Sequence, residues 1–377
     1  MNPAASLSDL VAELAQEAGF AATGIAAVPD PASPEDYAEL QNVEPWLASG
    51  RAGEMEYLKR RDEAGRLLRS SLRVALPWAR SVIVCAANYN SGAPNSTEPA
   101  PSSRGWIARY AWTGKPSGDG QVRPSDYHKV LLHRLRSMET KLKDLYGDFQ
   151  SRCYVDTGPI VERIYAKYAG IGWIGKNTCI LNEQLGSWLF LGVIATSIEV
   201  SPASIAAVPE DRCGSCRRCI EACPTGALTD AYRMDASLCI SYLTIEKRGE
   251  IPEQLRAQIG RQIFGCDICQ DVCPWNRRAP LGRDVELSTR ADLVNPALDW
   301  LAAIDESGFA NLFHGSPVTR TKLSGLRRNV AIAMGNSRLR SFLPKLQEWS
   351  QAADTVLAAT AAWAITQIES QPSTDGL

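Results

Sequence analysis

A short run of closely spaced cysteines constrains this chain more than any other feature. The run reads Cys-Gly-Ser-Cys-Arg-Arg-Cys-Ile-Glu-Ala-Cys over residues 213–223, and Pro224 follows it. Three thiolates on a tight loop and a fourth one turn later are the spacing that holds an iron–sulfur cluster. A second group, Cys266, Cys269 and Cys273, is also followed by a proline. We therefore expect a domain organised around iron–sulfur clusters.

The two groups predict two [4Fe–4S] clusters with exchanged ligands. In two-cluster ferredoxins the fourth cysteine of each run ligates the other cluster. By this rule, one cluster takes Cys213, Cys216, Cys219 and Cys273. The other cluster takes Cys223, Cys266 and Cys269, and Cys239 fills its open place because it is the one unassigned cysteine of this region.

Two alternatives to redox clusters remain at this point, namely zinc sites and clusters that only brace the fold. Zinc ribbons separate two Cys-x2-Cys pairs by about 15–20 residues. Here Cys213, Cys216 and Cys219 fall within one short loop, which favours clusters over zinc. A structural role for the clusters is compatible with the same spacing, because metal sites also stabilise small domains.

The rest of the composition is that of a soluble protein with two or three domains. The chain has 377 residues, of which 45% are apolar and 22% are charged, and no apolar run approaches the ~20 residues that span a bilayer. The first residues lack the pattern of a secretory signal, so we expect a cytoplasmic location. In that compartment cysteines indicate metal ligation rather than disulfides. Cys85, Cys153 and Cys179 stand among apolar neighbours and are expected to be buried structural thiols.

The hydrophobic pattern divides the chain into three parts. Over residues 1–205 strands alternate with helices, which predicts an α/β or α+β domain. Residues 206–285 hold the clustered cysteines, and from 286 to 377 the pattern is wholly helical, with paired helices that resemble HEAT-type units. Within the first part the pattern places strands at 23–28, 81–89 and 188–198, helices at 7–18 and 46–68, and an exposed insertion at 113–124.

A glycine loop in the first part imitates a nucleotide-binding motif. Gly170-x-Gly172-x-x-Gly175 matches the dinucleotide fingerprint, but a Rossmann loop follows a strand and opens a helix. This loop follows helical residues 160–169 and leads into a strand, so we expect no nicotinamide site. It is either the C-terminal turn of a helix or backbone that lies against a large flat ligand.

Asp156 stands just before Thr-Gly-Pro and a helix, and two roles fit it. It could cap that helix, with Pro159 in the first turn. It could instead be a general acid whose pKa is raised by burial. The spacing does not decide between these two roles.

The histidines give little support for a metal site. His128 and His133 lie on a charged helix and are expected at the surface. Asp126-Tyr-His128 begins the Asp-x-His-x-x-Gly motif that supplies histidine to cobalt in some cobalamin proteins, but Leu131 replaces the glycine. We therefore expect no cobalt ligation from this motif.

Taken together, the motifs resemble the epoxyqueuosine reductase family. The match extends over nearly the whole chain, although residues 113–123 enlarge a segment that is short in that family. It rests on Gly53-Glu-Met-Glu-Tyr57, Arg109-Tyr110, Asp126-Tyr-His128, Asp156-Thr-Gly-Pro159, Gly170-Ile-Gly-Trp-Ile-Gly-Lys-Asn177, the cysteine run continued to Ala227, Cys239-Ile-Ser241, Gly265-Cys-Asp-Ile-Cys-Gln-Asp-Val-Cys-Pro-Trp-Asn276 and Arg328-Asn-Val-Ala-Ile-Ala-Met-Gly-Asn336.

This resemblance implies an architecture, cofactors and residue roles. Members of the family bind cobalamin between an α/β domain, here 1–205, and a ferredoxin-like domain with two [4Fe–4S] clusters, here 206–285. A HEAT-like domain, here 286–377, contacts the tRNA. They reduce epoxyqueuosine at the wobble position of tRNA to queuosine, and Asp156 matches their proton donor. The implied cobalamin contacts are Tyr57, Arg109, Asp156, Asn177, Ile180, Leu191, Ser241 and Asp267.

A basic surface is expected to hold the tRNA backbone. No acidic residue occurs between Ser307 and Gln347, and we expect phosphate contacts from Lys247, Arg248, Arg327 and Arg328. An unstacked loop base would then enter the pocket. A solvated helix face is the alternative for the basic stretch.

We expect a monomer that has no membrane attachment and receives electrons from a donor that the sequence does not identify. Two other functions remain as alternatives. One is a different corrinoid reductase, similar to reductive dehalogenases, and the other is a non-enzymatic electron carrier or RNA-binding adaptor.

Overall fold

The first part of the molecule is built on one antiparallel sheet. The computed structural model describes residues 6–30, 37–118, 120–201 and 204–370. The sheet has the order β1–β2–β9–β6, and all three of its ladders are antiparallel. Its strands are β1 Ala22–Ala27, β2 Ser81–Asn88, β9 Leu189–Thr196 and β6 Ser151–Tyr154. Helices and strands are mixed as expected, but the antiparallel pairing makes the arrangement α+β rather than parallel α/β.

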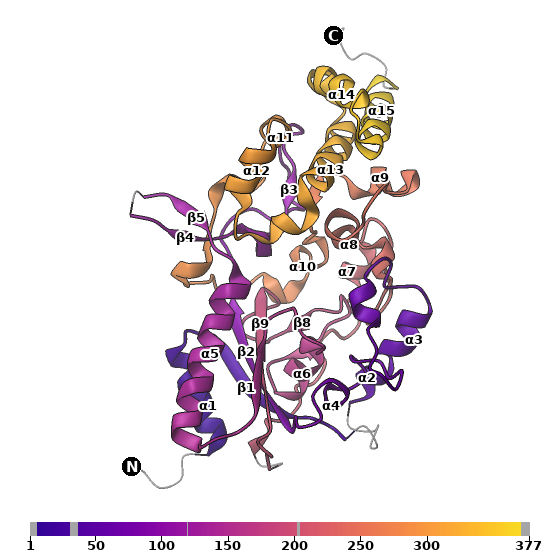
Figure 1. The fold of residues 1–377 in the computed structure, drawn as a ribbon. Coiled ribbons are helices and arrows are strands. Elements are labelled where there is room, and N and C mark those ends of the chain that lie inside the picture. Colours follow the sequence, from indigo (N-terminus) through magenta and orange to yellow (C-terminus); the bar gives the residue numbers. More distant parts are fainter. Residues whose placement is uncertain (1–5, 31–36, 119, 202–203, 371–377) are drawn as a thin grey trace.

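Helices cover both faces of this sheet (Figure 1). Side chains of β2 alternate between them, because successive residues of a strand point to opposite faces. Ile83 and Cys85 pack in one core with helices α1 (Leu7–Glu17) and α5 (Tyr127–Tyr146). Val82 and Val84 pack in a second core with α6 (Glu162–Tyr168). Burial on both faces explains why the strand reads as an unbroken apolar run.

Most elements expected in this part are present, but the long helix predicted over 46–68 is wrong. The structure has α3 at Val43–Ala48 and a 3-10 turn at Glu56–Lys59 instead. Gly50 and Gly53 take φ values of +75° and +56°, which an α-helix does not accommodate. Two further short helices flank this region, α2 at Ala38–Gln41 and α4 at Leu72–Ala75.

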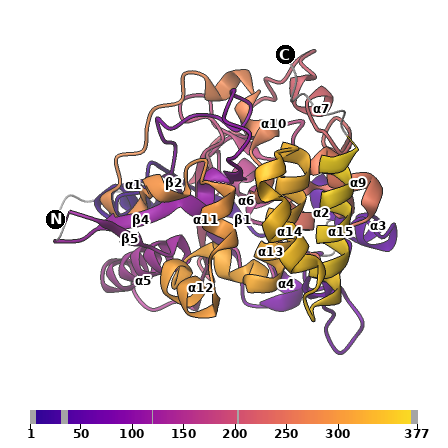
Figure 2. The same cartoon turned by 90° about the horizontal axis from the view of Figure 1, so that it is seen from above.

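The expected insertion forms a hairpin that projects from the body of the molecule (Figure 2). Its strands are β4 Thr113–Pro116 and β5 Val122–Pro124, and β13 Ser288–Thr289 adds a third strand. Lys115 is exposed, as predicted, whereas Thr113 is buried at the base of the hairpin.

The cysteine region consists of short elements between the sheet and the C-terminal helices. Helices α7 and α10 pack against each other, and each begins within a Cys-x2-Cys sequence, Cys216–Cys219 for α7 and Cys266–Cys269 for α10. Strand β12 pairs in parallel with β3 from the first part of the chain. The elements are α7 Arg218–Glu221, β10 Leu228–Asp230, β11 Arg233–Met234, α8 Ile240–Ile245, α9 Glu253–Ile259, β12 Gln262–Phe264, α10 Ile268–Asp271 and β3 Trp106–Ile107.

The C-terminal part is helical, as expected, and shares a core with the cysteine region. Val330 of α13 belongs to one buried cluster with Leu243 of α8 and Ile263 of β12. The packing is therefore continuous across residue 285. No helix among the described residues is long and apolar enough to cross a membrane. The helices are α11 Leu298–Ala302, α12 Glu306–Phe313, α13 Lys322–Ser337, α14 Leu343–Ser350 and α15 Thr355–Glu369.

Candidate active site and cluster region

The thiols of the cysteine region fall into two electrostatic groups. In the first group, burial and the charges of Cys213 and Cys216 raise the pKa of Cys219. Burial raises the pKa of Cys273 to about 11, and the charges of Cys213 and Cys219 contribute. Cys213, Cys216 and Cys219 therefore lie near Cys273.

The remaining four cysteines form the second group. Burial and the charge of Cys223 raise the pKa of Cys239. Burial and the charges of Cys239 and Cys223 raise that of Cys266. Cys269 is influenced by Cys266 and Cys239 as well. These neighbours correspond to the exchanged ligand sets expected from the spacing.

Backbone N–H groups are directed at several of these sulfurs. Burial raises the pKa of the Cys239 thiol, while the N–H groups of Ser241 and Tyr242 at the start of α8 lower it. Ile268 N–H does the same for Cys266, and Trp275 N–H for Cys273. Hydrogen bonds to the sulfurs are one of the means by which proteins tune iron–sulfur clusters.

The arrangement of the thiols differs from that of a mononuclear metal site. Among the described residues, no three Cys, His, Asp or Glu side chains converge so as to hold one metal ion. A [4Fe–4S] cluster distributes its four thiolates over different irons, so its ligands need not meet at one point.

Cys179 lies closer to the clusters than a purely structural thiol would. A hydrogen bond with Cys269 lowers the pKa of Cys179 against the effect of burial, and Cys179 also influences Cys273. Sequence reasoning missed this position, because the chain separates Cys179 from the other thiols. Cys85 is fully buried, as expected, and Cys153 is partly buried beside Glu139.

Asp156 is not a helix cap. Helix α6 begins at Glu162, its N-cap is Val161, and no side chain caps it. Asp156 instead takes φ +54°, which non-glycine residues adopt rarely and mostly at turns and functional sites. Its side chain is 51% exposed, so its carboxylate remains accessible.

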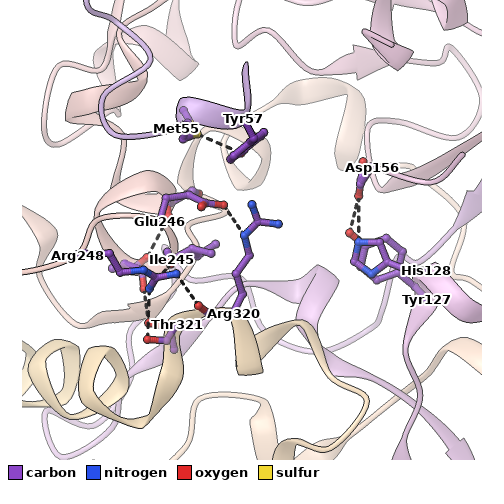
Figure 3. A network of polar contacts seen from close by, with 12 residues as sticks. Met55, Tyr57, Tyr127, His128, Asp156, Ile245, Glu246, Arg248, Arg320 and Thr321 are labelled. Atoms are coloured by element: carbon purple, nitrogen blue, oxygen red, sulfur yellow. Dashed lines mark hydrogen bonds and ion pairs between the residues drawn. The ribbon is translucent and has the colours of Figure 1, made fainter. Parts of the chain in front are cut away.

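Two side chains from the start of α5 reach the Asp156 carboxylate (Figure 3). The Tyr127 hydroxyl donates a hydrogen bond of 2.5 Å to Oδ2. The Nε2 atom of His128 lies 3.9 Å from the same oxygen. His128 is 31% exposed, which agrees with the expected surface position, but its approach to Asp156 was not foreseen, because the turn at Asp156 folds back onto α5.

A row of aromatic rings connects Asp156 with the cysteine region. The Tyr110 ring lies 6.2 Å from Tyr127 and 5.9 Å from Phe264, two residues before Cys266. Burial raises the pKa of Tyr110 strongly, and the charges of Asp156 and Asp267 add to this effect. Tyr110 therefore lies close enough to both Asp156 and Asp267 for each carboxylate to disfavour its ionisation.

Glu162 is a second carboxyl near Asp156. Burial, followed by the charge of Asp156, raises the pKa of Glu162 to about 7. Its Oε1 atom is buried and has no hydrogen-bond partner among the described residues. No sequence pattern singles out this group, since a glutamate in a first helical turn is ordinary.

The expected cobalamin contacts lie in the first part of the chain and in the cysteine region. Asp267 is buried and accepts a hydrogen bond of 2.6 Å from the Arg109 N–H. Asn177 is buried and donates to the carbonyl of Cys269. Ile180 and Leu191 are buried on β8 (Ile180–Leu181) and β9, and Ser241 lies in the first turn of α8.

Some of these residues have unused capacity for a ligand. The Arg109 guanidinium donates to the carbonyl of Ser91 and lies over the Trp188 ring, but its Nε is buried without a partner among the described residues. Tyr57 is 41% exposed, so part of its side chain can contact a ligand. A buried donor and an open ring fit a flat macrocycle that carries amide groups. Cobalamin is such a molecule.

The glycine loop follows directly on the end of α6. Helix α6 ends at Tyr168, and Gly170 follows with φ +77°, which is typical of a helix C-terminal turn. A Cβ on Gly172 would lie 2.0 Å from the carbonyl oxygen of Leu181. Gly172 is needed because β7 (Trp173–Ile174) and β8 pack closely, so the helix-turn interpretation holds.

The residues expected to contact tRNA are mostly engaged within the protein. Lys247 forms an ion pair with Glu54, and Arg248 donates to the carbonyls of Arg320 and Thr321. Arg327 donates to the carbonyl of Ile304.

Arg328 differs from these three, because it is buried at 3% exposure. It donates to the carbonyls of Leu243, Lys247 and Gly249. A direct phosphate contact is therefore wrong for Arg328, because the guanidinium holds the loop after α8 from the inside.

An additional arginine, Arg320, lies between Glu246 and Tyr57 (Figure 3). Arg320 lies between α12 and α13, forms an ion pair of 2.6 Å with Glu246, and lies 5.4 Å from the centre of the Tyr57 ring. It therefore joins the three parts of the chain at one point. Arg320 belongs to the basic stretch of the sequence, but its position beside Tyr57 was not foreseen.

Comparison with known proteins agrees with this arrangement. A family model described as epoxyqueuosine reductase QueG matches residues 69–157, and one described as a 4Fe-4S double cluster binding domain matches residues 212–276. The epoxyqueuosine reductase of Escherichia coli (strain K12) is 36% identical over 97% of this chain and 92% of its own length. That of Synechocystis is 40% identical over 81% of this chain and 98% of its own.

Solved structures show the same similarity. A crystal structure of epoxyqueuosine reductase with an epoxyqueuosine-modified tRNA stem loop has a TM-score of 0.81 and 29% identity, covering 98% of this chain and 95% of that one. The Bacillus subtilis enzyme with its catalytic aspartate loop swung out of the active site has a TM-score of 0.80 and 30% identity, covering 96% of this chain and 90% of that one. With such identity over most of both lengths, the chain belongs to the epoxyqueuosine reductase family.

Proposed function

We propose that this protein reduces epoxyqueuosine in tRNA to queuosine. The observation that carries the proposal is the position of Tyr110. Its ring lies next to Tyr127, and the charges of Asp156 and Asp267 both raise its pKa. The Asp156 carboxylate and the cluster region thus lie at opposite ends of the same row of aromatic rings, Tyr127, Tyr110 and Phe264. Family membership supports the same activity, since relatives named epoxyqueuosine reductase match nearly the whole chain.

The reaction requires two electrons and two protons, and the epoxide oxygen leaves as water. We propose that one [4Fe–4S] cluster is held by Cys213, Cys216, Cys219 and Cys273, and the other by Cys223, Cys239, Cys266 and Cys269. The pairwise influences among these thiols support the two sets. An external donor that remains to be identified would supply the electrons.

Cobalamin would be held between the first part of the chain and the cluster region. Tyr57, Arg109, Asn177, Ser241 and Asp267 would bind it, and Ile180 and Leu191 would pack against it. When bound, it supplies a low-valent cobalt that acts as a strong nucleophile or reductant, chemistry that belongs to the cofactor.

Asp156 would donate the proton to the departing epoxide oxygen. Its backbone turn and the hydrogen bond from Tyr127 hold the carboxyl group in position. General acid catalysis by a positioned side chain typically contributes about 10²–10⁴-fold.

We propose that the tRNA lies along the helical part, which we regard as HEAT-like, and that its loop base enters beside Tyr57 and Arg320. Lys247, Arg248 and Arg327 stay proposed phosphate contacts, and the exposed Lys322 joins them. Arg328 supports this surface from within. The proposed domains remain 1–205, 206–285 and 286–377.

Analysis of tRNA nucleosides from a strain that lacks the gene tests this function. We expect epoxyqueuosine to accumulate and queuosine to disappear, and a plasmid copy of the gene to restore queuosine. Unchanged queuosine in the deletion strain would overturn the proposal.

A further inference from the structure

His128 is a titratable side chain that connects the Asp156 carboxylate with solvent. Its Nε2 lies 3.9 Å from Asp156 Oδ2, and its side chain is 31% exposed. This distance is longer than a hydrogen bond. A small rotation or one bridging water would complete the contact, and catalytic hydrogen bonds are often long before the substrate binds.

The imidazole ring of His128 is held from two sides. Its Nδ1 lies 2.8 Å from Oδ1 of Asp126, the N-cap of α5. Its ring stacks on Tyr127 with 4.0 Å between centroids. A carboxylate on one ring nitrogen fixes the orientation and tautomer of the other. Asp126 therefore directs Nε2 of His128 toward Asp156.

The other groups near Asp156 are less suited to supply protons from solvent. Burial and the charge of Asp156 raise the pKa of Tyr127 well above its ordinary value, so this hydroxyl keeps its proton. The Oε1 atom of Glu162 is buried and has no partner among the described residues that could replace a proton. The charged groups around His128 are Asp126 and Lys129 on α5 and Asp156 on the facing turn.

We propose that His128 reloads Asp156 with protons from solvent and that Asp126 positions the ring for this transfer. This inference rests on the proposed function, in which every turnover consumes two protons. In the step, the N–H bond at Nε2 of the imidazolium breaks and an O–H bond forms at Oδ2 of Asp156. The neutral imidazole then takes a proton from water through its exposed edge, and no electron is transferred.

The test is the pH dependence of the reduction of epoxyqueuosine tRNA by the cobalamin-loaded, reduced protein. We expect the rate of His128→Gln to be about 10- to 100-fold lower than the wild-type rate and to depend less on pH. The KM for tRNA should stay unchanged, and added imidazole should restore part of the rate of His128→Ala.

Control variants separate proton supply from structure. His133→Gln, on the same helix but exposed and outside the network, should retain the wild-type rate and pH profile. Asp126→Asn keeps a capping side chain but loses the carboxylate, so it should lower kcat without changing KM. If His128→Gln fails to fold, this second variant decides the question.

Wild-type kcat and an unchanged pH profile in His128→Gln, or in Asp126→Asn, would overturn this inference and leave the proposed function intact. An inactive wild-type protein would instead contradict the proposed function itself. The two failures are therefore distinguishable.

Discussion

The Asp156 carboxylate accepts a hydrogen bond of 2.5 Å from the Tyr127 hydroxyl, which joins the turn after β6 to the first turn of α5. Asp156→Asn should preserve this turn, because the amide oxygen can accept the same hydrogen bond. We expect both clusters and cobalamin to be retained, and turnover to fall by about 10²–10⁴-fold. Iron content, the cobalamin spectrum and the turnover rate measure these effects.

Asp144→Asn is a matched control for this substitution. Asp144 is exposed on α5, at the end of that helix far from Tyr127. It should retain full activity. Full activity of Asp156→Asn would exclude Asp156 as the proton donor.

Cys239 was assigned by elimination, and iron analysis tests that assignment. Cys239→Ala should disrupt the cluster held by Cys223, Cys266 and Cys269 and lower the iron content from about eight to about four per chain. Cys153→Ala should retain all the iron, because Cys153 lies beside Glu139 and away from both groups. Full iron content in Cys239→Ala would require another ligand, for which Cys179, hydrogen-bonded to Cys269, is a candidate.

Arg328 should matter for stability rather than for direct tRNA contact. Arg328→Met removes donors from the carbonyls of Leu243, Lys247 and Gly249 and should lower the free energy of unfolding by about 3 kcal/mol. Chemical denaturation of both proteins measures this loss. The exposed Lys322→Met should change it by less than about 0.5 kcal/mol. An Arg328→Met protein with wild-type stability but weakened tRNA binding would reinstate the direct contact.

Glu162 should make the stability dependent on pH. Burial raises the pKa of Glu162 to about 7, so between the ordinary pKa of a glutamate and this value the folded state binds an extra proton. The stability that this group contributes is therefore present at low pH and is lost as pH rises toward 7. Glu162→Gln carries no charge, so it should gain about 2 kcal/mol relative to wild type at pH 8 compared with pH 5.

Thermal unfolding of the two proteins at both pH values measures this difference. If the stability difference between Glu162→Gln and wild type were the same at pH 5 and pH 8, the charge of the Glu162 carboxylate would not destabilise the folded state, which would contradict this prediction.

Features that depend on the spacing of nearby residues could be predicted from the sequence. Contacts between segments that are far apart in the chain could not. The cysteine groups and strands β2 and β9 follow from residue patterns, and the structure has them where they were expected. The contact between His128 and Asp156, and that between Arg320 and Tyr57, join segments far apart in the chain. The burial of Arg328 also depends on tertiary packing, because the residues next to it in the chain do not indicate whether its side chain faces solvent or the interior.

The most direct test of the central claim uses the purified protein itself. The protein is prepared without oxygen, supplied with cobalamin and a chemical reductant, and incubated with tRNA that carries epoxyqueuosine. We predict that queuosine forms in the tRNA, and that it does not form when cobalamin is omitted. Unchanged epoxyqueuosine with a protein that carries both clusters and cobalamin would contradict the account.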